Sequence, residues 1–346
     1  MGEWNNTTFA PAGAEAFPKY QGFAKLKIVL RRASRYCRAI AKTANTVIPR
    51  NRIVSNPRKV SSNYMLKIGG HVSTAGGLYK AIENAARIGA NAIQIFGASP
   101  QQWRVGMPDS AGMKRYRDAL GKSDVQSVYL HGAYLVNLGS ATKELVEKSI
   151  QNLADHLAIT ELIGGQGLIF HIGSAGEQKK EAAIKKVIAS MRVVLQKVPG
   201  KAQLIMENAA GSGQKLGSTP EEMGVIMNAL DSDRVKVCFD TAHAFEAGII
   251  ETYSPAEIKN HFDAWDKAIG IKNLVALHVN DSKSPFNSHY DRHENLGKGF
   301  IGLKSFKNLA KEKRLHDKAW LLEVPGFDDE GPDKKNVDIL KSCFVK

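Results

Sequence analysis

Eight short apolar segments recur along this chain of 346 residues and constrain its fold more than any other feature. Each is about five to seven residues long and nearly continuous in apolar residues. Strands that are buried on both faces, as in a parallel sheet, have this pattern. The predicted strands are Leu66–Val72, Ala92–Phe96, Val125–Leu130, Gly167–Ile172, Gln203–Glu207, Val235–Phe239, Leu274–Val279 and Ala319–Val324.

Segments with the 3.6-residue period of amphipathic helices separate these strands. Thr219-Pro220 and Ser254-Pro255 each place a capping oxygen before a proline, a good helix start, and Gly164-Gly165 follows a helical run as a stop signal. Parallel neighbours need crossovers of this length. Eight strand-then-helix units after Met65 therefore favour an α/β fold of the (β/α)8 TIM barrel type over a doubly wound open sheet.

Composition excludes several other classes of protein. With 43% hydrophobic and 24% charged residues the chain can bury a core, and no stretch approaches the ~20 apolar residues of a membrane span. The cysteines Cys37, Cys238 and Cys343 are far apart and form no CxxC pair, which argues against a disulfide framework or a thiolate zinc site. We therefore expect a cytoplasmic protein, associated with the nucleoid if the source is bacterial.

The formal charge of +14 is concentrated before Met65. Residues 1–64 contain twelve Lys or Arg and two acidic residues, whereas the other 282 residues carry 36 basic and 32 acidic groups. We predict a basic, poorly ordered N-terminal extension over residues 1–64 and a compact domain over residues 65–346. Three interpretations of the extension are open: an organellar transit segment in a eukaryote, an arm that holds DNA weakly, or a stretch upstream of the working start at Met65.

Histidines and carboxylates stand where the predicted strands end. In a parallel barrel the carboxyl ends of all strands meet at one rim, where active sites are built. Any one of these residues could be an ordinary polar group. Ordinary polar groups do not easily explain why residues of metal-ligand type recur at the same end of successive strands. The residues at or next to strand ends are His71, His131, His171, Glu207, Asp240, His278 and Glu323, with His243 three residues after Asp240. Asp291 and His293 lie in the long loop after the seventh strand.

Four carboxylates gathered at one rim would repel one another unless they were protonated or bound to metal. Imidazole and carboxylate ligands without a thiolate suit zinc or manganese. Two divalent ions would neutralise the four charges, and a third would leave a positive site suited to a phosphate. Two-metal sites hydrolyse phosphodiesters by activating water and holding the attacking and leaving oxygens in line.

Eight short motifs surround these residues: Gly70–Gly77, Leu130–Gly139, Phe170–Ser174, Met206–Asn208, Phe239–Phe245, Leu277–Lys283, Asp291–Glu294 and Leu322–Glu323. In content and order they closely resemble the endonuclease IV family of zinc-dependent apurinic/apyrimidinic (AP) endonucleases. The resemblance runs from about Met65 to Glu330 and includes nothing before Met65. It implies a TIM barrel, a DNA-repair function and a trinuclear zinc site.

The resemblance also implies which residues bind each ion, with manganese possible at one site. The ligand sets would be His131, His171 and Glu207 for the first zinc; Glu207, Asp240, His278 and Glu323 for the second; and His243, Asp291 and His293 for the third. Glu207, shared by two ions, would be the catalytic residue that positions a zinc-bound hydroxide. That hydroxide would cut DNA 5′ to an abasic site, leaving a 3′-hydroxyl and a 5′-deoxyribose phosphate, and 3′-phosphatase or 3′-phosphodiesterase side activity would follow.

The implied partner is double-stranded DNA with abasic or 3′-blocked sites, bound by a monomer. Flipping a nucleotide out of the duplex costs least where its base is missing. Tyr134 matches a family residue that enters the gap in the stack, and Trp103 and His71 are further candidate DNA contacts. Gln101 stands where an Arg is usual, which puts a charged wedge in doubt. Trp103 could equally pack beneath its loop.

The glycine-rich run Ala210–Gly217 has no GK[ST] ending, so an active-site loop is favoured over a nucleotide-binding loop.

Two rival functions share part of the sequence pattern. A two-metal TIM-barrel sugar isomerase would use a similar metal quartet, but it has no use for the third set, with His243, Asp291 and His293. A non-catalytic DNA-damage binder is the remaining alternative, and the intact ligand set argues against it.

Overall fold

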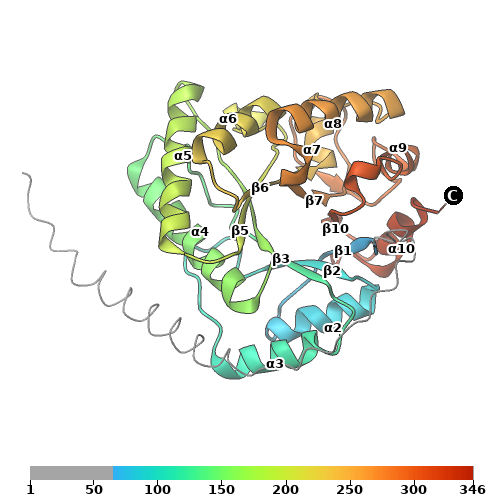
Figure 1. The fold of residues 1–346 in the computed structure, drawn as a ribbon. Helices are drawn as coiled ribbons and strands as arrows, with labels where there is room; N and C mark the ends of the chain where they lie inside the picture. Colours follow the sequence, from blue (N-terminus) through green and yellow to red (C-terminus); the bar gives the residue numbers. More distant parts are fainter. Residues whose placement is uncertain (1–64, 346) are drawn as a thin grey trace, which may run out of the picture. The chain divides into compact units, whose positions relative to one another are not determined.

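The structure, a computed structural model, describes residues 65–345. The predicted N-terminal extension lies outside the described residues, so its interpretations and the domain boundary at Met65 stay predictions. Eight parallel strands close into a barrel in the order β1-β10-β7-β6-β5-β4-β3-β2, which confirms the predicted TIM barrel (Figure 1). The strands are β1 (Lys67–His71), β2 (Ala92–Phe96), β3 (Ser127–His131), β4 (Gly167–His171), β5 (Gln203–Glu207), β6 (Val235–Asp240), β7 (Leu274–His278) and β10 (Ala319–Leu322).

Strand ends differ from the predicted ones by at most two residues. β10 ends at Leu322 rather than Val324, because the backbone N–H of Glu323 donates to Asn280 Oδ1 (2.7 Å) instead of to a neighbouring strand. A short antiparallel pair that was not predicted, β8 (Asp281–Ser282) and β9 (His293–Glu294), forms at the carboxyl end of β7.

Helices surround the barrel on its outside (Figure 1). The predicted caps are confirmed, since Thr219 and Ser254 accept backbone hydrogen bonds at the starts of their helices and Gly164 ends α4 with φ 71°. The helices are α2 (Leu78–Ile88), α3 (Ser110–Leu120), α4 (Lys143–Ile163), α5 (Lys180–Lys197), α6 (Pro220–Leu230), α7 (Thr241–Glu246), α8 (Pro255–Ile269), α9 (Leu303–Leu309) and α10 (Lys334–Ser342), with 3-10 turns η1 (Ser212–Gln214), η2 (Ile271–Asn273) and η3 (Lys313–Leu315).

The barrel interior contains an apolar cluster to which seven of the eight strands contribute. We call it the apolar layer: Ala92, Tyr129, Ile169, Ile205, Cys238, Ala276, Ala319 and Leu321. Intervening residues such as Leu204 and Met206 belong to the larger core that packs under the helices. Side chains alternate along a strand, so the residue two positions after an interior one also faces the interior.

That next position forms a second layer, which we call the rim layer. Every barrel strand supplies one member, either as the last residue of the strand or within two residues of its end. The members are His71, Gln94, His131, His171, Glu207, Asp240, His278 and Glu323. The fold therefore converts eight separate strand ends into one ring of polar side chains above an apolar floor.

A bulge sets the register between two of these strands. The pairing of β6 with β7 shifts by one residue between Val237 and Cys238, where Val275 is the extra residue. Beyond the bulge, Asp240 lies opposite His278. Both side chains thereby face the interior of the barrel.

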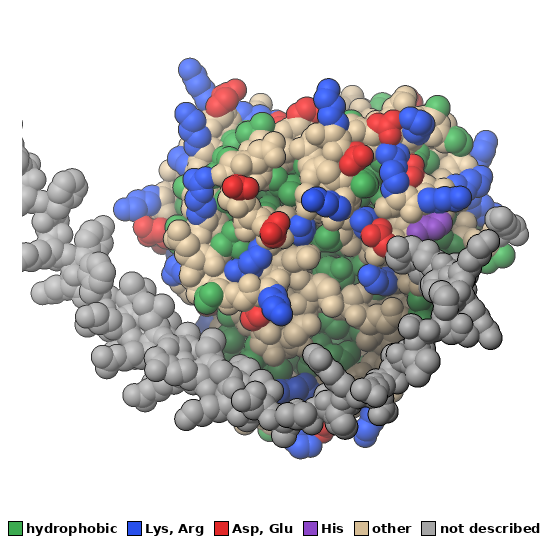
Figure 2. Space-filling view, viewed as in Figure 1, with side chains coloured by type: hydrophobic (Ala, Val, Ile, Leu, Met, Phe, Trp, Pro, Cys, Tyr) green, Lys and Arg blue, Asp and Glu red, His purple; other side chains and the backbone are tan. Residues whose placement is uncertain are grey.

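The outer surface of the barrel unit is mixed in charge. On the face shown in Figure 2, Lys and Arg side chains are interspersed with Asp and Glu. Among residues 65–345, no helix combines the length and apolar character needed to cross a membrane.

Candidate metal centre

The first group of predicted ligands comes from three adjacent strands. His131, His171 and Glu207 each offer an atom within 4.8 Å of the others. Glu207 Oε2 lies 3.2 Å from His131 Nε2 and 3.6 Å from His171 Nδ1. Glu207 is completely buried, so this carboxylate is held inside the protein with imidazoles as its neighbours.

The second group shares Glu207 with the first and adds Asp240, His278 and Glu323. His278 Nδ1 lies 2.9 Å from Glu207 Oε1 and 3.2 Å from Glu323 Oε2. Asp240 Oδ2 is 3.9 Å from the same nitrogen. One imidazole nitrogen therefore faces three carboxylates.

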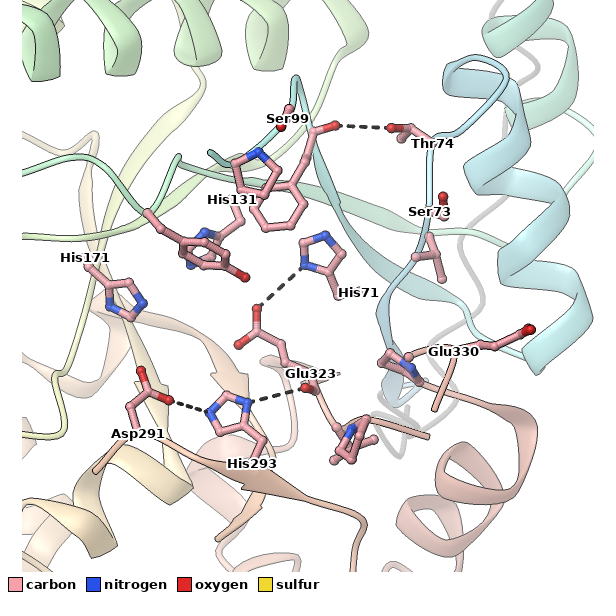
Figure 3. Close-up of a pocket in the computed structure, with 18 of the residues that line it drawn as sticks. His71, Ser73, Thr74, Ser99, His131, His171, Asp291, His293, Glu323 and Glu330 are labelled. Carbon is pink, nitrogen blue, oxygen red and sulfur yellow. Dashed lines mark hydrogen bonds and ion pairs between the residues drawn. The ribbon is translucent and has the colours of Figure 1, made fainter. Parts of the chain in front are cut away.

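The third group lies beside the second and combines a helix with the β8–β9 pair. Asp240, His243 and His293 have ligand atoms within 4.8 Å of one another. Asp291 joins them, with its oxygens 3.2 Å from His243 Nε2 and 3.6 Å from His293 Nε2. Figure 3 shows Asp291, His293 and Glu323 pointing into the same pocket. The structure thus brings together all nine predicted ligands.

Several ring nitrogens in this cluster are buried and have no hydrogen-bond partner among the described residues. They are His171 Nδ1, His243 Nε2 and His293 Nε2. Buried polar atoms are normally paired. Lone pairs aimed at a shared space, beside carboxylates, are what a divalent cation such as zinc binds, so the residues present fit a metal.

The ionisable groups perturb one another strongly. Burial opposes ionisation of Glu207, yet the imidazoles of His171 and His278 hold the pKa of its carboxyl well below the usual value. Burial also opposes a charge on His243, but nearby carboxylates, first Asp240, raise the pKa of that imidazole well above the usual value. Burial lowers the pKa of His171 to about 4. His171 is therefore neutral at pH 7, the form in which histidine binds a metal.

Three amide side chains that the sequence did not single out support the ligands. Gln94 contacts His278 and Glu323, and Asn280 Nδ2 donates to Asp240 Oδ2 (2.7 Å). Asn208 Oδ1 accepts from the backbone N–H of Asp240 (2.6 Å). The signal that could have found Gln94 is a lone polar residue two positions after Ala92 in an apolar strand.

Glu246, at the end of α7, holds the loop that carries two ligands. Its Oε1 accepts from Ser282 Oγ (2.7 Å) and from the backbone N–H of Arg292 (3.1 Å), the residue between Asp291 and His293. Burial raises the pKa of the Glu246 carboxyl to about 7. No pattern in the sequence marked this residue.

A pocket of about 1000 Å³ opens above the metal ligands. His71 and Tyr134 line it, and Tyr134 is 60% exposed. Lys215 also lines it, so the glycine-rich run Ala210–Gly217 reaches this pocket. Gln101 and Trp103 are not among the lining residues; Gln101 is exposed and Trp103 is half-buried on the adjoining loop, with its carbonyl bonded to Asn152 of α4.

Comparisons with known proteins agree with this architecture. A family model described as a xylose isomerase-like TIM barrel matches residues 82–343. A probable endonuclease 4 of Halothermothrix orenii is 36% identical over 279 residues, which are 80% of this chain and 99% of that protein. The crystal structure of endonuclease IV from Thermus thermophilus superimposes with a TM-score of 0.70 at 32% identity, covering 80% of this chain and 98% of that one.

The chain belongs to the endonuclease IV family. Membership makes it a hydrolase of the nuclease type and agrees with the metal-binding groups on its rim. A D-tagatose 3-epimerase-like protein also superimposes, with a TM-score of 0.62 at 17% identity over 80% of this chain and 97% of that one, and this likeness concerns the fold alone.

Proposed function

We propose that this endonuclease IV family member cuts double-stranded DNA on the 5′ side of abasic sites. The products would be a 3′-hydroxyl and a 5′-deoxyribose phosphate. The observation that carries the proposal is the convergence of three linked ligand groups at the floor of an open pocket. A phosphate with its neighbouring sugars is a substrate of the size and charge that such a floor can accept.

The proposed cofactor is zinc, three ions per chain, with manganese acceptable at one site. The ligand sets are His131, His171 and Glu207; Glu207, Asp240, His278 and Glu323; and His243, Asp291 and His293. Bound divalent zinc supplies positive charge that stabilises the developing phosphate charge and lowers the pKa of water. The orphaned ring nitrogens and clustered carboxylates support this assignment.

Glu207 is the proposed catalytic residue. Its two oxygens face different ligand groups, Oε2 towards His131 and Oε1 towards His278. Complete burial removes competing water from this carboxylate and fixes its direction. Glu207 can therefore hold an attacking water at a set position between the two groups.

Lesion recognition is assigned to the side chains around the pocket. Tyr134 is aromatic, exposed and in edge contact with the ring of Phe96, at a centroid distance of 5.6 Å, so it can enter a gap in the base stack. His71 lines the same pocket, whereas Gln101 and Trp103 would contact DNA from the adjoining loop. We propose that the protein does this as a monomer.

A nicking assay tests the proposal. The zinc-loaded protein should cut a duplex once, 5′ to a single abasic analogue, and Glu207→Gln should lower the rate at least ~1000-fold. Glu161→Gln is the matched control, since within residues 65–345 the Glu161 carboxylate accepts hydrogen bonds just from the backbone N–H groups of Lys201 and Ala202, ahead of β5. It should cut at the wild-type rate.

Two other outcomes would contradict the proposal. Zinc-loaded wild-type protein that binds the duplex without cutting it would be a damage binder, and one that isomerises a free sugar would be an isomerase. The proposed side activity has its own substrate, a duplex with a 3′-phosphate. Release of inorganic phosphate should require Glu207 as well, because the same groups would bind the terminal phosphate.

A further inference from the structure

Gln94 is the rim-layer residue of β2, and its side chain is completely buried. The amide reaches across the barrel interior to residues far away in the sequence. Its Oε1 lies 2.8 Å from His278 Nε2, and its Nε2 donates to Glu323 Oε1 at 2.5 Å. The same Nε2 is 3.0 Å from His71 Nδ1. One amide thus contacts two proposed zinc ligands and one proposed DNA contact.

The partners fix which way this amide points. If the amide were reversed, its oxygen would face the carboxylate of Glu323 at hydrogen-bond distance, acceptor against acceptor. With the NH₂ group on Glu323, the carbonyl faces His278 and requires a donor there. His278 must then carry its proton on Nε2.

This proton position decides what the other side of the His278 ring can do. In the neutral ring Nδ1 then keeps its lone pair, and Nδ1 is the atom that faces Glu207 Oε1 and Glu323 Oε2. A metal-binding histidine usually donates its second ring N–H to a neighbouring acceptor, which holds the ring and its tautomer. Gln94 supplies that acceptor.

The second N–H of the amide fixes which ring nitrogen of His71 carries the proton. Because Nδ1 of His71 is within hydrogen-bond distance of an NH₂ group, it accepts, and the ring proton lies on Nε2. His71 lines the pocket, where this N–H can serve as a donor to a phosphate or sugar oxygen. The close-up shows His71 between Glu323 and the loop after β1 (Figure 3).

We propose that Gln94 is a positioning residue that presets the second ligand set, by holding His278 and Glu323 in their metal-binding form and His71 as a donor. The inference rests on the metal centre of the proposed function and adds to it a residue that would touch neither metal nor DNA. An apolar residue of similar size would leave the His278 N–H buried without an acceptor and would remove a donor from Glu323.

The test compares zinc binding by Gln94→Met and the wild type at buffered free zinc. Mutation of a residue behind a ligand typically weakens metal binding about 10- to 100-fold. We expect a free zinc concentration at which the wild type holds three ions and Gln94→Met holds two. Nicking by the variant should recover when free zinc is raised about 100-fold, which a general folding defect would not allow.

Two further variants keep the test decisive. Gln166→Met is the control for the same substitution away from the rim, because the exposed Gln166 precedes β4 at the opposite end of the barrel and its Oε1 accepts from the backbone N–H of Val128 (2.7 Å). It should hold three ions. Gln94→Glu keeps the acceptor for His278 but loses both donors, so its zinc affinity should also fall, and it decides the matter if Gln94→Met does not fold.

The outcomes separate the inference from the function it rests on. Three ions of wild-type affinity in both Gln94 variants would overturn the role of Gln94 and leave the metal centre intact. A wild type that takes up no zinc would overturn the metal centre itself, and the positioning role with it. Nitrogen NMR of labelled histidines gives an independent reading: the Nε2–H form of His71 should be lost in Gln94→Met and kept in Gln166→Met.

Discussion

The barrel interior holds two layers that are two residues apart on each strand and meet opposite physical demands. In the apolar layer, side chains such as Ile169 and Ile205 satisfy one another by contact alone. In the rim layer, three carboxylates, four imidazoles and one amide lie together without a Lys or Arg. The first layer is complete as folded, whereas the second needs protons or metal ions to balance its charge.

The comparison shows how one backbone separates stability from chemistry. The apolar layer provides burial and holds the strands, and its members could change to others of similar volume at little cost. The rim layer is held by the same strands, and its function depends on what it binds. Four predictions test this division, from the largest expected effect to the smallest.

Removal of metal should affect the protein most. A site filled at 1000 times its dissociation constant stabilises the fold by about 4 kcal/mol, so stripping several sites should lower the unfolding free energy by several times that amount. Urea unfolding with and without a chelator measures this. Glu207→Gln, which loses a shared ligand, should respond less to the chelator. Equal unfolding curves for the wild type in both conditions would contradict the division.

A truncation in the apolar layer should cost stability without changing the metal content. Ile205 is completely buried two residues before Glu207. Ile205→Ala should lower the unfolding free energy by about 2–5 kcal/mol through lost contacts and a cavity. Metal analysis of the folded variant should still give the wild-type zinc content. Loss of zinc at unchanged stability would show that the two layers are not separable.

Truncation of Asn280, which supports two rim-layer residues, should have a smaller effect, on both stability and zinc affinity. Asn280 donates to Asp240 and accepts from the backbone N–H of Glu323 (2.7 Å each). Asn280→Ala should cost about 1–3 kcal/mol and weaken zinc binding about 10-fold. Asn336→Ala is the control: that buried amide bonds Asn295 and the backbone of Leu296, so it should cost stability and leave zinc affinity as it was.

The smallest effect concerns pH. The Glu246 carboxyl has a pKa of about 7 in the folded protein, above its ordinary value of 4.5. A raised pKa means that its stabilising contribution is full below pH 4.5 and is lost as the pH rises through 7. Glu246→Gln cannot titrate, so its stability relative to the wild type should rise by an amount on the order of 1 kcal/mol between pH 5 and pH 8. Denaturant unfolding at several pH values measures this. A constant difference would mean that the carboxyl titrates normally.

Most of the fold could be predicted because its signals are local. Apolar runs such as Gln203–Glu207 and capped helix starts such as Thr219-Pro220 can be recognised within a few residues of sequence. Candidate ligands at the strand ends were predicted for a related reason, since the barrel places consecutive strand ends at one rim. Their division into three metal-binding sets came from the resemblance to the endonuclease IV family. Gln94 was missed because its role depends on His278, 184 residues away, which no local pattern connects to it. The β8–β9 pair was missed because two-residue strands have no periodicity.

The bulge at Val275 gives chain length itself a functional meaning. Because Val275 is the extra residue of the bulge, a chain without it could still pair Leu274 with Val237 and Ala276 with Cys238. A deletion after the bulge, between Ala276 and His278, would instead move His278 by one position. A slip of one residue turns a side chain to the other face of a sheet, so His278 would point at the helices. The strand can therefore vary in length at Val275, whereas the stretch from Ala276 to His278 must keep a fixed count.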